Sequence, residues 1–380
     1  MIGLMWKAVL FLFLSLALGF IPGCYVNPHY NPDKPHHTPN GFRNNYPHEP
    51  TGSFWKWRWE RFWSGLPKEP EGGYQPKILK PDIKALTARL LSPSVTWIGH
   101  ATLLLQMGRV NVLTDPHLTS RASPFDFIGP KRRVRPALTF DELPHIDIVV
   151  ISHNHYDHLD RETIQRLSAQ TGGPPRFFVP LGLKAWFNDL DIANVEEQDW
   201  WEQTEHLGIK VQLVPVQHWS ARSRFDRNET LWGGYVLEHG GFKFFFAGDT
   251  GYSADFKDIG RRLGPMDLAA IPIGGYEPRW FMKIMHVNPE EAVKIHQDVR
   301  ARYSVGIHWG TFELSGEPID EPPKRLAAAL KEAQIDPEQF FVMKHGETRR
   351  LDHKTFSSVT PRGRKWQNAA STSELNSTTH

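Results

Sequence analysis

The amino-acid sequence predicts a single α/β domain with metal-binding residues at the ends of its strands. Short apolar runs rich in β-branched residues alternate with amphipathic stretches of helical period. Several apolar runs end directly at a His or an Asp, which places polar side chains at the carboxyl ends of buried strands. The globular part, residues 93–352, spans about 260 residues, a size that one α/β domain can reach.

The first strands of this domain are expected at 95–98, 102–107 and 110–114, with Gly108 and Arg109 as the turn of a hairpin. Capping residues, or Pro in the first turn, begin several of the amphipathic stretches, as is typical of helices. The remaining strands are expected at 146–151, 211–216, 242–247 and 305–307, and helices at 160–170, 253–263, 289–299 and 323–333.

The run 152–159 follows the expected strand 146–151 and holds four candidate metal ligands within six positions. Imidazole and carboxylate groups suit a borderline divalent ion such as zinc. The alternative is a polar loop that is rich in His by coincidence, since the chain has 19 His residues. The spacing at the end of an apolar strand favours the metal site. The four candidates are His153, His155, Asp157 and His158.

Three other strands end at one further candidate ligand each: His218 after 211–216, Asp249 after 242–247 and His308 after 305–307. Taken singly, each is better explained as a core or turn residue. The recurrence of the same arrangement after four strands makes coincidence a poor explanation. The seven ligands, five His and two Asp, suffice for two ions if one carboxylate bridges them.

The order of these ligands resembles the metallo-β-lactamase superfamily of binuclear hydrolases. Longer segments resemble one of its branches, the phospholipase D enzymes that hydrolyse N-acyl phosphatidylethanolamine. The most specific segment is 269–283, Ala-Ala-Ile-Pro-Ile-Gly-Gly-Tyr-Glu-Pro-Arg-Trp-Phe-Met-Lys, which His286 and Val287 follow. The other matching segments run in the family's order between residues 97 and 347, at 97–102, 113–116, 120–124, 129–132, 199–202, 217–219, 244–252 and 289–292.

The resemblance implies an αββα sandwich, with helices outside two sheets and the site at one edge of the sheets. It also implies two Zn²⁺ per chain, with iron or manganese as alternatives, and a homodimer as one oligomeric state. His153, His155 and His218 are then expected to hold one ion, and Asp157, His158 and His308 the other, with Asp249 bridging.

The activity implied by the resemblance is hydrolysis of a glycerophospholipid phosphodiester. A hydroxide shared by the two ions attacks the phosphorus, so that N-acylethanolamine and phosphatidic acid are released. Asp157, Asp249 and His286 are then the catalytic residues, and Tyr156 and His286 contact the substrate headgroup. The alternatives are another hydrolase of the superfamily, such as a lactonase or a broad phosphodiesterase, and a non-catalytic envelope lipoprotein.

Three further positions near the motif bear on the site. Asp115 and His100 stand in turns beside the metal loop and are expected to orient the ligands, with a purely structural turn role as the alternative. Met285 stands where the mammalian enzymes carry Gln, which removes a hydrogen-bonding side chain from the headgroup site.

The composition adds limits on the partners of the protein. A net charge of +2 gives no indication of nucleic-acid binding. The 14 Trp and 23 Phe residues are explained equally by a large aromatic core and by a site that binds acyl chains. The substrate class implied by the resemblance brings the protein to a membrane surface.

The N-terminus predicts its location. Lys7 precedes a 14-residue apolar run at 8–21, which is short for a membrane span, and Cys24 follows. Residues 1–24 therefore resemble a bacterial lipoprotein signal with Cys24 as the lipidation site; a plain cleaved signal or an uncleaved anchor is the alternative. Tyr25 in place of an Asp favours the outer membrane of the cell envelope, facing the periplasm.

Residues 25–92 are expected to form a tether and an aromatic, basic segment. The polar tract 25–50 lacks periodicity, so its His residues are expected to be solvated. The run 54–63 is expected to lie at a membrane interface or, equally, to pack on the domain by its Trp-rich face. A disordered tail is expected at 353–380. The Trp-rich face consists of Trp55, Trp59, Phe62 and Trp63.

Overall fold

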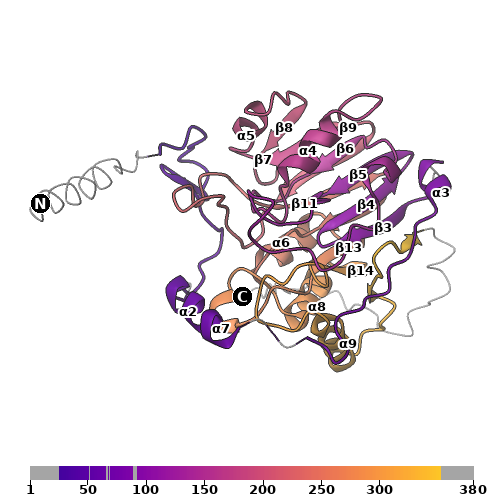
Figure 1. Ribbon diagram of the computed structural model, residues 1–380. Coiled ribbons are helices and arrows are strands. Elements are labelled where there is room, and N and C mark those ends of the chain that lie inside the picture. Colours follow the sequence, from indigo (N-terminus) through magenta and orange to yellow (C-terminus); the bar gives the residue numbers. More distant parts are fainter. Residues whose placement is uncertain (1–24, 51, 66, 68, 89–91, 352–380) are drawn as a thin grey trace, which may run out of the picture.

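The computed structural model describes residues 25–50, 52–65, 67, 69–88 and 92–351 (Figure 1). The predicted lipoprotein signal with Cys24 and the predicted tail at 353–380 lie outside this range. Two large mixed sheets pack face to face, and helices cover their outer faces. The αββα sandwich implied by the sequence resemblance is therefore confirmed.

The first sheet has seven strands, and its parallel half points toward the predicted metal loop. Strands β5, β6, β7 and β8 run parallel, so the residues that follow them meet at one edge of the sheet. The order is β16 (Thr348–Arg350), β3 (Ser94–Gly99), β4 (Thr102–Met107), β5 (Val110–Thr114), β6 (Ile148–Val150), β7 (Arg176–Pro180) and β8 (Val195–Gln198).

The second sheet also has seven strands, of which β12 to β15 run parallel. Its order is β15 (Phe340–Val342), β14 (Ala301–Ile307), β13 (Met266–Pro272), β12 (Phe242–Phe246), β11 (Gly234–His239), β10 (Ile209–Val214) and β9 (Gln203–His206).

The predicted hairpin between β4 and β5 is present. Met107 pairs with Val110, which leaves Gly108 and Arg109 as a two-residue turn. Their φ angles are 54° and 75°, the left-handed values that a tight hairpin turn requires at both central positions.

The four helices predicted in the domain are present to within a few residues, and three short helices were not predicted. Asn288 caps α8 (Pro289–Asp298) through a reciprocal pair of hydrogen bonds with Glu291, and Pro289 stands at the first helical position. The other helices are α3 (Ile83–Thr87), α4 (Arg161–Ser168), α5 (Lys184–Asn188), α6 (Asp255–Arg262), α7 (Arg279–Met282) and α9 (Glu321–Ala333), with a 3₁₀ turn, η1, at Phe140–Glu142.

The main core lies between the two sheets and is mostly aromatic and β-branched. Trp97 of the first sheet and Phe244, Phe245 and Phe246 of the second are fully buried. A second cluster, which includes Ile164 of α4, lies beneath the helices that cover the first sheet. Much of the aromatic content noted in the sequence is therefore core.

The prediction of an extended tether at 25–50 is wrong, because this segment packs on the domain. It contains a short hairpin, β1 (His37–Thr38) with β2 (Gly41–Phe42). His36 and His37 are buried and both contact the carboxylate of Asp199, at 2.6 and 2.9 Å. Lys34 contacts the same carboxylate at 2.5 Å. Charged partners on the domain therefore fix a segment whose composition alone indicates disorder.

The aromatic run at 54–63 forms α2 (Phe54–Ser64), which begins at the capping side chain of Ser53. Its Trp-rich face is exposed, so the alternative of packing on the domain by that face is wrong. None of the helices within the described stretches of residues 25–351 has the length and apolar character needed to cross a bilayer.

Candidate metal centre

The candidate ligands gather at the edge of the sandwich where strands of both sheets end. His153 follows β6, His218 follows β10, Asp249 follows β12 and His308 follows β14. Within each sheet these strands point the same way, so their carboxyl ends lie together. Ligands that follow different strands in the sequence therefore form one cluster in space.

Three imidazoles form the first group. The Nε2 atom of His153 lies 2.8 Å from Nδ1 of His155, and Nε2 of His218 lies 3.3 Å from the same Nδ1. A tetrahedral zinc ion with Zn–N bonds of about 2.0–2.1 Å places its nitrogen ligands roughly 3.3 Å apart. The three nitrogens lie within 4.8 Å of one another, close to the separations of ligands on a single ion.

The outer nitrogens of this group have partners that fix the rings. Nδ1 of His218 contacts the carbonyl oxygen of Met285 at 2.9 Å, and Nδ1 of His153 contacts Oγ of Ser152 at 2.8 Å. The rings of His153 and His218 are thus each held by one nitrogen while the other faces the cluster, the usual arrangement of metal-binding His.

Asp157, His158 and His308 form the second group, and His100 joins them. Oδ2 of Asp157 lies 3.2 Å from Nε2 of His158 and 3.3 Å from Nε2 of His308. Nε2 of His100 contacts the same oxygen at 2.9 Å. This contact supports the expectation that His100 orients a ligand.

Asp249 stands between the two groups. Its Oδ2 lies 3.1 Å from Nε2 of both His158 and His308. It also lies within 4.8 Å of ligand atoms of His218 and His286. This position agrees with the predicted bridging role, which stays a prediction.

Asp115 lies behind the cluster and holds His158. Its Oδ2 contacts Nδ1 of His158 at 2.6 Å, and its Oδ1 accepts from the backbone N–H of Ser152 at 2.6 Å. Because both oxygens are occupied, Asp115 is placed to orient a ligand rather than to be one.

The backbone is strained at three of these positions. His100, Asp115 and His308 have φ angles of 54°, 33° and 59°, which non-glycine residues adopt infrequently. Such conformations persist where the surrounding contacts impose them, and they cluster at functional sites.

The two buried carboxylates of the cluster are stabilised by positive charge on the neighbouring imidazoles. Burial raises the pKa of Asp157 and Asp249, but the neighbouring imidazoles, of which His158 contributes most, together outweigh burial and hold both pKa values well below the usual value. Burial lowers the pKa of His308, but Asp249 and Asp157 outweigh it and raise the pKa to about 9. Protonated imidazoles thus balance two buried carboxylates, as a divalent ion would.

The residues fit divalent ions on a second ground. Nε2 of His158, which faces Asp157 and Asp249, and Oδ1 of Asp249 are buried and have no hydrogen-bond partner among the residues that the structure describes. Buried polar atoms without partners are costly. A nitrogen and oxygen donor set of this kind suits zinc. The number and identity of the ions stay a prediction.

A cavity of about 760 Å³ opens from the metal cluster to the surface. His155, Asp157, Asp249, His286 and His308 line its inner end. Its walls are largely apolar. They include Phe54, Trp57, Trp219, Phe281, Met282, Met285 and Leu314.

The two predicted substrate residues both line this cavity. Nδ1 of His286 lies 3.7 Å from Oδ2 of Asp249, and burial lowers the pKa of His286 to about 3. The Tyr156 hydroxyl donates to the carbonyl oxygen of Arg222 at 3.0 Å. Tyr156 therefore also has a role in holding the loop.

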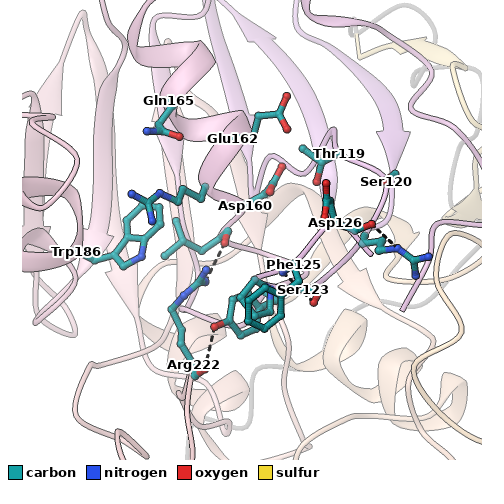
Figure 2. A pocket seen from close by; sticks show the side chains of 15 residues that line it. Thr119, Ser120, Ser123, Phe125, Asp126, Asp160, Glu162, Gln165, Trp186 and Arg222 are labelled. Carbon is teal, nitrogen blue, oxygen red and sulfur yellow. Dashed lines mark hydrogen bonds between the residues drawn. The ribbon is translucent and has the colours of Figure 1, made fainter. Parts of the chain in front are cut away.

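Arg222 supports the metal loop from a second cavity of about 440 Å³, which Figure 2 shows with Arg222 and Trp186 on its wall. Its guanidinium group lies 4.0 Å from the ring centroid of Tyr156. It donates to the carbonyl oxygens of Asn154 and Leu159 at 2.8 and 2.9 Å. These contacts clamp both ends of the loop that carries the ligands.

Sequence reasoning missed several residues of the site. Arg222 binds carbonyl oxygens of the metal loop, and Asn44 forms two hydrogen bonds with the backbone of His218. Single polar residues of that kind carry no sequence signal. Trp219, Phe281 and Met282 lie in segments that resemble the family, but the sequence gives no indication that they line the cavity. The adjacency of Trp219 to His218 was the signal that could have placed it at the site.

Comparison with known proteins agrees with this arrangement. The family model described as the β-lactamase superfamily domain matches residues 110–309. The N-acyl-phosphatidylethanolamine-hydrolyzing phospholipase D 1 of Caenorhabditis elegans is 43% identical over 251 residues, which cover 63% of this chain and 70% of that protein.

A second relative is the mitochondrial N-acyl-phosphatidylethanolamine-hydrolyzing phospholipase D of Saccharomyces cerevisiae, 39% identical over 241 residues. The match covers 61% of this chain and half the length of the yeast protein. Among solved structures, isothiocyanate hydrolase from Delia radicum gut bacteria has a TM-score of 0.55 at 19% identity, covering 67% of this chain and 98% of that one. That likeness supports the fold alone.

Proposed function

The chain belongs to the metallo-β-lactamase superfamily of metal-dependent hydrolases, and from that premise we propose that it is a phospholipase D-type phosphodiesterase. The proposed reaction releases N-acylethanolamine and phosphatidic acid from N-acyl phosphatidylethanolamine. The observation that supports it best is the cluster of candidate ligands beside a large apolar cavity, which His155, Asp157, Asp249 and His308 line directly. A phosphodiester that carries acyl chains needs both features in one site.

Each group of the site has a defined task in this proposal. Two zinc ions, when bound, supply Lewis acidity and lower the pKa of coordinated water. His153, His155 and His218 hold one ion, and Asp157, His158 and His308 hold the other. Asp249 lies between the groups and is the proposed bridge.

The walls of the cavity position the substrate in this proposal. The neutral imidazole of His286 lies beside Asp249 and faces the cavity, where it can donate a hydrogen bond to a phosphate oxygen. The ring of Tyr156 lines the same cavity. The apolar walls bind acyl chains and exclude bulk water, which strengthens the electrostatic interactions at the inner end.

Met285 bears on the choice of headgroup. Its side chain is 6% exposed and packs with Phe281 and Met282, while its backbone carbonyl holds His218. An apolar side chain here provides no hydrogen bond to an amide or amine of the headgroup. We therefore propose that the enzyme also accepts glycerophospholipids without an N-acyl group.

The predicted location is part of the same proposal. Anchoring by a lipid on Cys24 to a bacterial outer membrane, facing the periplasm, would keep the cavity close to its substrate. The support for this location is the sequence of residues 1–24 alone.

A substrate panel tests the proposed function. The zinc-loaded protein is assayed on vesicles with N-acyl phosphatidylethanolamine or unmodified phospholipids, on bis(p-nitrophenyl) phosphate and on acyl lactones. We expect turnover of the phosphodiesters and loss of activity in Asp249→Ala. Asp141→Ala, at an exposed position of η1, is the matched control. Turnover of lactones with no phosphodiesterase activity would assign a lactonase instead, and no turnover in the metal-loaded protein would favour a binding lipoprotein.

A further inference from the structure

Two exposed aromatic surfaces flank the mouth of the metal-site cavity. One is the outer face of α2, and the other is the tip of the loop 121–131, termed here the aromatic loop. Both contribute walls to the cavity: Phe54 and Trp57 from α2, and Ala122 and Pro130 from the aromatic loop.

The outer face of α2 projects away from the domain. On its inner face, Trp57 stacks on Phe281 with the ring centroids 5.3 Å apart, and the Arg61 guanidinium donates to the carbonyl oxygen of Ser315 at 2.9 Å. These contacts fix the helix on the rim of the cavity. The outer face consists of Trp55, Trp59, Phe62 and Trp63, which are 70%, 64%, 75% and 69% exposed.

The aromatic loop projects from the other side. Its base is closed, because the backbone N–H of Ala122 donates to the carbonyl oxygen of Pro130 at 3.0 Å and Arg121 donates to two carbonyls within the loop. The apolar side chains at its tip are exposed to solvent. There Phe125, Phe127 and Ile128 are 55%, 74% and 58% exposed, with the two phenyl rings 5.5 Å apart.

Seven large exposed apolar side chains on the two elements that contribute walls to the cavity exceed the scattered exposure that is normal for a protein surface. Trp and Phe at such positions are typical of groups that enter the headgroup region of a bilayer. The cations beside them support the same partner. Exposed Lys56 and Arg58 on α2 outnumber Glu60, and exposed Lys131 at the base of the aromatic loop balances Asp126 at its tip.

We propose that the outer face of α2 and the tip of the aromatic loop insert together into the headgroup region of an anionic phospholipid bilayer, with the cavity mouth between them. This proposal rests on the proposed function, since a lipid substrate is delivered only if the mouth faces the bilayer. A second copy of the chain fits less well, because a two-fold interface would bring the same cations face to face. Anionic headgroups complement them.

A local probe tests the insertion without catalysis. Cys24 is the only cysteine in the sequence, so Cys24→Ser allows one introduced cysteine to be labelled with an environment-sensitive fluorophore. The labelled positions are Phe62→Cys on α2 and Phe127→Cys on the aromatic loop. Leu207→Cys is the matched control, since Leu207 is a 55% exposed apolar residue in the turn before β10, at the opposite edge of the sandwich.

Vesicles of phosphatidylethanolamine and phosphatidylglycerol without any N-acyl lipid are then added. We expect a blue shift and stronger emission at positions 62 and 127 and no change at position 207. A response at all three positions, or at none, would overturn the proposal. So would a blue-shifted probe before vesicles are added, together with a dimer in sedimentation velocity, because the surface would then be covered by protein.

Substitution of two residues on the outer face of α2 provides a second test of the proposal. Trp55→Gln with Phe62→Gln in the full chain is expected to weaken binding to these vesicles about tenfold or more, because less apolar area enters the bilayer. Turnover of soluble bis(p-nitrophenyl) phosphate should stay unchanged. Unchanged vesicle binding in a folded variant would overturn the docking surface. Absence of soluble turnover in the parent protein would instead count against the proposed function.

Discussion

Asn44 binds the backbone of His218 in both directions: its side-chain nitrogen donates to the carbonyl oxygen, and its side-chain oxygen accepts from the N–H, each at 3.0 Å. A residue of the N-terminal segment thus fixes the backbone of a candidate metal ligand 174 positions further along the chain. The segment 25–50 is therefore a part of the site.

Asn44→Ala should weaken the first metal group. Without the two hydrogen bonds, the loop that carries His218 loses its fixed position, and the change should lower metal affinity or activity on the order of 10-fold to 100-fold. Competition with a chelator measures the affinity. Asn45→Ala is the control, because Asn45 donates to Asp255 and not to a ligand. Equal metal affinity in the two variants would contradict the link.

Asp115→Asn should selectively abolish metal binding by the second group of ligands. The carboxylate holds Nδ1 of His158, so that Nε2 is free to bind. An amide in its place can donate to Nδ1, which moves the ring proton to Nε2 and removes the ligand atom. Elemental analysis should find one ion per chain instead of two. Full occupancy with unchanged activity would show that Asp115 has only a turn role.

Without metal, the stability of the folded protein should decrease as the pH rises. The pKa of His308 is raised to about 9 in the folded protein without ions, above its unfolded value of about 6.5. A raised pKa contributes stability below about pH 6.5, and this contribution is lost as the pH rises through about 9.

Thermal unfolding in a chelator should therefore shift to lower temperature between pH 6.5 and 9, the range between those two pKa values. Zinc should abolish this shift, because the ion replaces the proton as the partner of Asp249 and Asp157. Parallel pH profiles with and without zinc would show that the cluster does not bind the ion.

Met285→Gln should narrow the substrate range. The new amide can hydrogen-bond the N-acyl headgroup, so the ratio of turnover of N-acyl phosphatidylethanolamine to that of phosphatidylethanolamine should rise several-fold. Burying the amide costs about 1–3 kcal/mol of stability where it finds no partner. Competition between the two lipids in mixed vesicles gives the ratio directly. Met282→Gln, in the same apolar cluster, controls for polarity alone.

The sequence predicted the metal loops well, because their signal is local. Each of β6, β10, β12 and β14 is an apolar run that ends at a ligand, and the parallel direction of neighbouring strands brings these ends together. The same local reasoning placed the turn at Gly108 and Arg109.

The sequence failed where long-range contacts decide. Residues 25–50 have the composition of a flexible linker, yet the carboxylate of Asp199 binds Lys34, His36 and His37 and orders them. No local pattern reveals a partner about 160 residues away. For the same reason the supporting roles of Asn44 and Arg222 were not predicted, since both bind backbone groups of distant loops.

Hydrolysis in ¹⁸O-labelled water is the most direct test of the central claim, which is cleavage of the P–O bond to the N-acylethanolamine. Vesicles with N-acyl phosphatidylethanolamine are treated with the zinc-loaded protein, and the isotopic composition of both products is measured by mass spectrometry. The account predicts one ¹⁸O atom in the phosphate of phosphatidic acid and none in N-acylethanolamine. Release of diacylglycerol or fatty acid, or label in the N-acylethanolamine, would contradict it.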